Sequence, residues 1–134
     1  MTTRHASCRC GQLSAECRGD PVRSSVCHCL VCKQRTGSAF GAQARFTHDQ
    51  VKVSGTSKSW TRTADSGNKV TYHFCPECGS TVHYSGERFP GLTIVPVGAF
   101  ADPEFPAPRH SIFETRKSDW VELTGDEVEH LPYM

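Results

Sequence analysis

Apolar and polar side chains alternate in several short segments of this chain. Between Ser38 and Phe46 the apolar residues recur at every second position, and Val70–Phe74 and Val51–Val53 show the same period. A period of two places successive side chains on opposite faces, which is typical of a half-buried β-strand. The pattern therefore predicts short strands in these three segments.

Further short strands are predicted at Gln12–Cys17, around Trp60, and at Thr81–Tyr84, Leu92–Val97, Ile112–Thr115 and Asp119–Leu123. The residues Ala64–Asn68 favour a turn, and three prolines make Ala101–Arg109 an extended loop. Only Gly125–Leu131 indicates a helical turn. No repeat, heptad pattern or phosphate-binding loop is found. We therefore expect residues 1–134 to form a single all-β domain of short antiparallel sheets.

Charge and hydropathy argue against two classes of partner. The 15 Lys and Arg residues nearly balance the 14 Asp and Glu residues, so no excess of basic side chains predicts nucleic-acid binding. No apolar run approaches the ~20 residues that a membrane span needs, and the first residues lack the apolar core of a secretory signal. We therefore expect a cytoplasmic protein with reduced cysteines and no nucleic-acid or membrane partner.

Seven of the eight cysteines fall into three closely spaced groups. They are Cys8 and Cys10, then Cys27, Cys29 and Cys32, then Cys75 and Cys78. In a reducing compartment such spacing indicates metal ligands rather than disulfides. Gly79 can adopt positive φ, which lets the Cys75–Cys78 turn curl beneath both sulfurs. The thiolates select a soft tetrahedral ion, for which zinc is our prediction and an iron–sulfur cluster the alternative.

The number of ligands in each group suggests two kinds of site. A closed structural zinc site needs four protein ligands, whereas a catalytic site keeps three and leaves one position open. Seven sulfurs divide into four plus three, with Cys27, Cys29 and Cys32 around one ion. The other four would then be Cys8, Cys10, Cys75 and Cys78. The spacing leaves alternatives open: His28, His73 or His83 could complete a site, and Cys8 and Cys10 could share an ion with the middle group.

The other Cys and His residues carry weaker signals. Cys17 is expected to be a small core residue of a strand. His28, which stands between two candidate ligands, is expected to be exposed or to support those ligands rather than to catalyse. A redox function of Cys75 and Cys78 would need a neighbouring βαβ pattern, and the sequence shows none.

Three motifs in this order resemble a known family. Cys8-x-Cys10 comes first, then Cys27-His28-Cys29-x-x-Cys32 with Gly37, and last Phe74-Cys75-Pro76-x-Cys78-Gly79-Ser80. Together they are similar to the glutathione-dependent formaldehyde-activating enzyme family, which includes proteins similar to centromere protein V. The resemblance implies an all-β, tent-like zinc fold. It also implies a structural zinc at Cys8, Cys10, Cys75 and Cys78, and a second zinc at Cys27, Cys29 and Cys32.

The resemblance further implies a carbon–sulfur lyase that reversibly adds glutathione to formaldehyde and gives S-(hydroxymethyl)glutathione. We expect two zinc ions per chain, one structural and one labile and catalytic. The catalytic residues would be Cys27, Cys29 and Cys32. Glutathione has two carboxylates, for which Lys33 and Arg35 are the candidate substrate-binding residues. Nothing in the sequence selects formaldehyde, so another small aldehyde or thiol fits the expected chemistry equally well.

A second class of function stays open at this point. The same cysteines could form a non-catalytic zinc module that binds a protein or nucleic acid, or that senses the thiol or metal state. The near-neutral charge weakens the nucleic-acid version of this alternative but leaves protein binding open.

Overall fold

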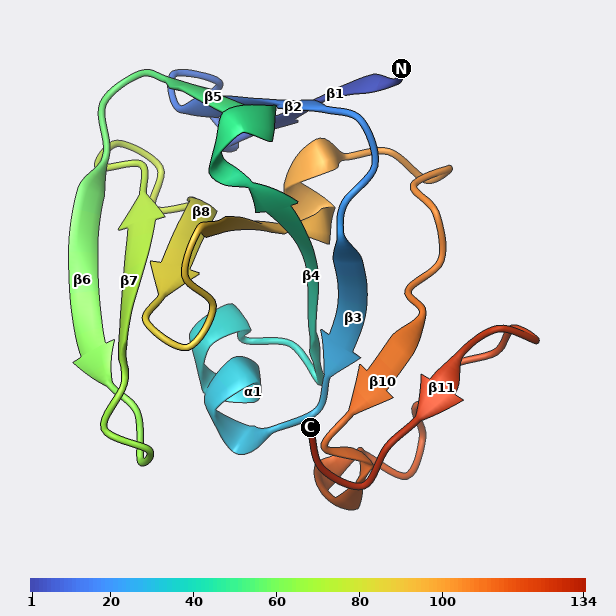
Figure 1. Ribbon diagram of the computed structural model, residues 1–134. Helices are drawn as coiled ribbons and strands as arrows, with labels where there is room; N and C mark the ends of the chain where they lie inside the picture. The colour runs from blue at the N-terminus through green and yellow to red at the C-terminus, as the bar shows by residue number, and fades with distance from the viewer.

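The computed structural model describes residues 1–134 and consists mainly of short β-strands in two sheets (Figure 1). The small sheet has the order β1-β2-β5, and the large sheet has the order β11-β10-β3-β4-β9-β8-β7-β6. The predicted all-β fold of short antiparallel sheets is thereby confirmed. No helix combines the length and apolar character needed to cross a membrane.

The strands are β1 Thr3–Ser7, β2 Ser14–Arg18, β3 Arg23–Cys27, β4 Gly41–Thr47, β5 Val51–Ser54, β6 Lys58–Thr63, β7 Lys69–Phe74, β8 Thr81–Gly86, β9 Leu92–Pro96, β10 His110–Ile112 and β11 Glu129–His130. One α-helix, α1 Leu30–Thr36, and three 3₁₀ turns, His48–Gln50, Val97–Phe100 and Glu114–Arg116, complete the structure.

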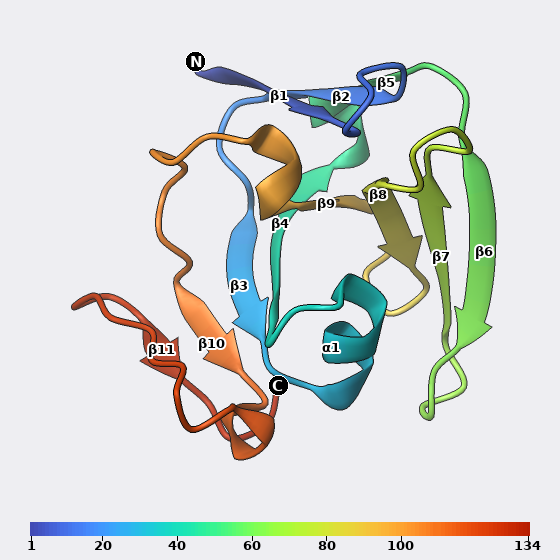
Figure 2. The ribbon, with the colours of Figure 1, turned by 180° about the vertical axis from the view of Figure 1, so that it is seen from behind.

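The large sheet curves around helix α1. Its strands pair antiparallel, except that β10 runs parallel to both β3 and β11. In both ribbon views α1 lies between the β3–β4 side of the sheet and the β6–β7 side (Figures 1 and 2). The small sheet packs across the opposite end of the molecule. The concave side of the large sheet is therefore partly enclosed by α1.

The main hydrophobic core lies between the two sheets. The small sheet contributes Ala6, Ala15 and Cys17, and the large sheet contributes residues such as Phe46 and Val82, all fully buried. The expectation that Cys17 is a core residue of a strand is confirmed. A smaller cluster of Tyr72, Tyr84 and Ile94 lies on the concave side of the large sheet.

Some predicted elements differ from the structure. The expected strand Asp119–Leu123 is turn and irregular chain, and Gly125–Leu131 contains the short strand β11 rather than a helical turn. The expected strand at Ile112–Thr115 is displaced toward the N-terminus as β10. Helix α1 was not predicted, and neither were strands β1 and β3. The unpredicted helix and β3 carry the three central cysteines.

Strand β4 is buried on both of its faces. Ala44 and Phe46 enter the main core, as the alternating pattern predicts. Gln43 and Arg45, on the opposite face, are only 7% exposed, because that face lines the concave side of the large sheet. A polar face that would normally contact solvent is therefore interior here.

Candidate functional site

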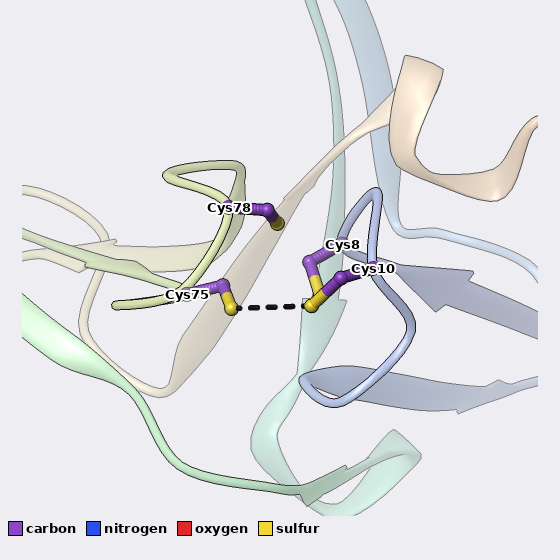
Figure 3. A group of neighbouring side chains, drawn as sticks. All are labelled: Cys8, Cys10, Cys75 and Cys78. Atoms are coloured by element: carbon purple, nitrogen blue, oxygen red, sulfur yellow. Dashed lines mark hydrogen bonds between the residues drawn. The ribbon is translucent and has the colours of Figure 1, made fainter.

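Four cysteines from two distant turns meet at the junction of the two sheets. Cys8 and Cys10 lie on the turn that follows β1, and Cys75 and Cys78 lie on the turn between β7 and β8 (Figure 3). Their sulfur atoms all lie within 4.8 Å of one another. We call this group the four-cysteine cluster.

Local backbone geometry holds the Cys75–Cys78 turn in shape. The N–H of Gly79 donates to the Cys75 carbonyl at 2.8 Å, and the N–H of Cys75 donates to the Ser80 carbonyl at 2.9 Å. Gly79 has φ of 80°, the left-handed conformation that the sequence predicted. Interactions with the Ser80 hydroxyl and backbone lower the pKa of Cys78 to about 5. Cys78 is therefore readily available as a thiolate, the form that ligates metals.

The sulfur separations in the four-cysteine cluster fit zinc. Cys10 Sγ lies 3.6 Å from Cys8 Sγ and 3.7 Å from Cys75 Sγ. Zinc–sulfur bonds of ~2.3 Å at tetrahedral angles would separate neighbouring ligand sulfurs by about 3.8 Å. A disulfide would need a separation of only about 2.0 Å, and all eight cysteines are free thiols. The donor set and spacing thus fit a closed tetrahedral zinc site.

Cys27, Cys29 and Cys32 form a second group, which we call the three-cysteine cluster. Cys27 ends strand β3, Cys29 is the N-terminal cap of α1, and Cys32 lies in its first turn. Their sulfurs also lie within 4.8 Å of one another, and no fourth Cys, His, Asp or Glu joins them. Two cysteine clusters that can each hold a metal ion are therefore present, one with four donors and one with three.

The start of α1 favours a thiolate at Cys29. The backbone N–H of Cys32 donates to Cys29 Sγ at 3.3 Å, which caps the helix. Interactions with the thiols of Cys27 and Cys32 also lower the pKa of Cys29, and the interaction with Cys29 raises the pKa of Cys27. These interactions favour the thiolate form of Cys29, which is the form that ligates metals.

His28 lies between two of these cysteines in the sequence but is not part of the three-cysteine cluster. Of the two expected positions for His28, the exposed one is wrong, because the side chain is fully buried and bonds to Ser111 of β10. The Nε2 atom lies 2.9 Å from Ser111 Oγ, and the backbone N–H donates to the Ile112 carbonyl at 3.1 Å. Burial lowers the pKa of His28, which favours a neutral ring. His28 thus ties the cysteine turn to β10.

A cavity of about 210 Å³ opens beside the three-cysteine cluster, with Cys27 and Cys32 in its wall. The concave face of the large sheet supplies most of the lining. Tyr72 and Tyr84 project from β7 and β8, and their ring centroids lie 5.1 Å apart. A small molecule in this cavity would therefore contact both the cluster and an aromatic wall.

The two predicted substrate-binding residues lie in different surroundings. The guanidinium of Arg35 lines the cavity, with its Cζ atom 5.2 Å from the Tyr72 ring centroid and 5.0 Å from that of Tyr84. Lys33 is not among the cavity-lining residues, and its Nζ donates to Ser118 Oγ at 3.1 Å. Their roles in substrate binding stay predictions.

Sequence reasoning missed three further arginines in the cavity wall. Arg45 comes from β4, Arg62 from β6, and Arg88 from the turn between β8 and β9. Burial and the neighbouring Arg23 lower the pKa of Arg45, but an arginine keeps its charge. In the sequence, only Arg45 could have indicated a basic cavity, because it lies on the polar face of the strand predicted at Ser38–Phe46. That face was expected to contact solvent.

Comparisons with known proteins agree with the fold and the cysteine pattern. A crystal structure of a Rhodobacter sphaeroides protein has a similar fold, with a TM-score of 0.57 and 17% sequence identity; the match covers 76% of this chain and 90% of that chain. No curated protein sequence matches this chain. Residues 3–116 match the family described as "Glutathione-dependent formaldehyde-activating enzyme", and this match spans both cysteine clusters. The chain therefore belongs to the glutathione-dependent formaldehyde-activating enzyme family.

Proposed function

We propose that this protein is a zinc-dependent carbon–sulfur lyase that joins a small aldehyde to a thiol such as glutathione and releases them again. The observation that carries the proposal is the three-cysteine cluster in the wall of a cavity. Three thiolates leave the fourth position of a tetrahedral ion for a substrate. Membership of the family supports glutathione and formaldehyde as the substrates.

The same proposal assigns different roles to the two clusters. Residues 1–134 act as one zinc domain, in which the four-cysteine cluster is structural. Cys27, Cys29 and Cys32 hold the second, labile zinc and are the catalytic residues. Zinc bound there would supply an anchor at which a thiol loses its proton at neutral pH. Three thiolate ligands already donate charge to the ion, so we favour thiol positioning over strong activation of the carbonyl.

The reaction is an addition that needs no oxidant or reductant. A bond forms between the thiol sulfur and the carbonyl carbon, the carbon–oxygen π bond breaks, and the thiol proton ends on the carbonyl oxygen. The reverse reaction restores the thiol and the aldehyde. Holding both reactants in one cavity removes part of the entropic cost of their encounter.

Residues of the chain itself would orient the reactants. Arg35 would bind a carboxylate of the thiol substrate, because its guanidinium already lies over two tyrosine rings at the cavity wall. Burial raises the pKa of Tyr84, so its hydroxyl stays protonated and can donate a hydrogen bond to the carbonyl oxygen. Lys33 is the predicted partner of the second carboxylate, and it would exchange its bond to Ser118 for this contact.

The test compares the wild-type protein with Cys29→Ser. Serine is a favoured helix N-cap, so the substitution keeps the start of α1 while it removes the thiolate. Exchange NMR with ¹³C-formaldehyde and glutathione measures how fast the adduct forms and dissociates. We expect zinc-loaded wild-type protein to accelerate exchange above the spontaneous rate, and Cys29→Ser to fall to that rate with an unchanged melting temperature. Equal exchange rates for the two proteins would contradict the proposal.

A further inference from the structure

Four arginines from four separate parts of the chain meet around one cavity. Arg35 belongs to α1, Arg45 to β4, and Arg62 to β6, and Arg88 follows β8. None of them forms an ion pair with a carboxylate or donates a side-chain hydrogen bond to another residue of the protein. Arg88 is exposed, but Arg35, Arg45 and Arg62 are partly or fully buried, and arginines in such positions normally have partners.

Arg45 is the clearest case of an unpaired cation. It is only 7% exposed, and its Nε atom is buried without a hydrogen-bond partner. Its Cζ atom lies 3.8 Å from the Phe89 ring centroid, which supplies a cation–π contact but no negative charge. Burial lowers the pKa of Arg45, and the neighbouring cations Arg23 and Arg88 lower it further.

No acidic side chain offsets this charge. The cavity lining contains neither Asp nor Glu, and an adjoining hollow that shares Arg35 and Arg62 contains none either. A zinc ion with three thiolates would carry a single formal negative charge, so the four guanidinium groups exceed it by three, or by two if the α-carboxylate of Met134, which also lines the cavity, is counted. Gln43 Oε1, in the cavity wall, is buried and has no hydrogen-bond donor. The excess of positive charge therefore attracts anionic groups to the cavity and disfavours a further cation there.

We propose that this arginine cavity binds a substrate with two or more carboxylate or phosphate groups and no ammonium group. The inference rests on the proposed function, because it specifies the substrate class of the same site. Glutathione has one ammonium beside its two carboxylates, and this ammonium would face like charges in the cavity. An acidic thiol without an amine, or an acidic aldehyde, fits the cavity better.

Binding of non-reactive acids tests the charge requirement without any chemistry. Isothermal titration calorimetry at low ionic strength compares acetate, succinate and aspartate, the last being succinate with an added ammonium. We expect succinate to bind at least about tenfold more tightly than acetate, and at least about fivefold more tightly than aspartate. Equal affinity for acetate and succinate would overturn the cavity as a site for several anionic groups. Equal affinity for succinate and aspartate would overturn the exclusion of ammonium.

Matched arginine variants locate the binding site. Arg62→Gln and Arg88→Gln each remove one cavity cation without disturbing the buried Arg45, and each should weaken succinate binding about tenfold. Arg116→Gln is the control, because Arg116 is exposed, has no ion pair and lines none of these cavities. Circular dichroism checks that every variant is folded. Weakening by Arg116→Gln equal to that by Arg62→Gln would overturn the assignment.

Two reaction arms identify which reactant carries the acidic groups. In one arm mercaptosuccinate reacts with formaldehyde, and in the other 2-mercaptoethanol reacts with 5-formylisophthalate, an aldehyde with two carboxylates, while glutathione with formaldehyde is the reference. We expect one acidic arm to exceed the reference in catalysed exchange. If glutathione is faster than both arms, the inference fails while the lyase proposal stands. If succinate binds as expected but no arm is catalysed, the lyase proposal fails while the anion-binding cavity stands.

Discussion

Cys10 Sγ and Cys75 Sγ lie 3.7 Å apart although 65 residues separate them along the chain (Figure 3). The first belongs to the turn after β1, in the small sheet, and the second to the β7–β8 hairpin of the large sheet. The four-cysteine cluster therefore joins the two sheets at the edge of the main core. This position makes the cluster a determinant of stability, which can be tested by mutation.

Cys78→Ser should prevent stable folding, because removing one ligand from a closed site forfeits folding free energy that metal binding supplies. We expect the thermal unfolding transition to be lost or its midpoint lowered by more than about 10 °C. Cys17→Ala is the control, since Cys17 is a buried cysteine outside both clusters and its loss should leave the zinc content unchanged. An unchanged melting temperature for Cys78→Ser would refute the structural role.

Mild chelation should remove zinc from one cluster before the other. An ion held by three protein ligands dissociates more readily than one held by four, so we expect two zinc ions per chain to fall to one while the fold survives. Elemental analysis and circular dichroism, measured on the same sample before and after chelation, check this. If both ions resist chelation equally, both sites are closed, and a non-catalytic zinc module becomes the better description.

Gly55→Ala should destabilise the protein strongly. Gly55 has φ of +99°, and a Cβ atom there would lie 1.9 Å from the Gln12 backbone oxygen. Gln12 also contacts the four-cysteine cluster, because its Nε2 atom donates to Cys75 Sγ at 3.0 Å. We expect the melting temperature to fall by more than about 10 °C.

Gly67→Ala is the matched control for this change. Gly67 has a similar φ of +89°, but no atom lies within 4 Å of its Cβ position. Only the conformational strain remains there, so we expect a decrease of about 4 °C. If the two variants have the same melting temperature, the close approach at Gly55 is not what limits substitution.

Acid should destabilise the protein partly through His83. Its ring stacks on His73 with centroids 4.4 Å apart, and burial together with His73 lowers its pKa to about 4 from the ordinary 6.5. The unfolded chain therefore takes up the proton more readily than the folded one. The stability associated with neutral His83 is present above pH ~6.5 and is lost as the pH falls toward ~4.

The variant His83→Gln should show a flatter dependence of melting temperature on pH between about pH 5 and pH 8. Acid also displaces zinc from thiolates, so the readout is the difference between the two proteins rather than either curve alone. Parallel curves for wild type and His83→Gln would rule out this contribution.

Most of the strands could be predicted because alternation records the difference in polarity between the two faces of a strand. The segment Ser38–Phe46 illustrates the limit of this signal. Its apolar face is buried as predicted, but the curvature of the sheet also covers Gln43 and Arg45 on the other face. Alternation cannot reveal whether a polar face meets solvent or an interior cavity.

Helix α1 was missed for a different reason. Its seven residues form about two turns, which is too short for a helical period to emerge. The cap residue is Cys29, which is not among the usual N-cap types, so the start of the helix carried no recognisable signal. Cys29 and Cys32 were interpreted as metal ligands on a turn, and this interpretation gave no indication of a helix at the same residues.

The two cysteine clusters could be anticipated from spacing, because ligands that share a turn are close in sequence. The structure brings Cys8, Cys10, Cys75 and Cys78 together, as the division into four and three suggested, while their roles as ligands stay predictions. The arginine cavity had no such local signal. Its arginines lie on separate elements, and only the curvature of the large sheet brings them together.

The separation of Cys10 and Cys75 also affects how the protein matures. A ribosome adds about 5–20 residues each second, so the first cysteine pair waits roughly 3–13 s for its partners to be synthesised. During this interval Cys8 and Cys10 are unpaired thiols on an incomplete chain. Oxidation of either sulfur at that stage would remove a ligand before the ion arrives. We therefore expect the supply of metal and a reducing environment during synthesis to affect the yield of folded protein.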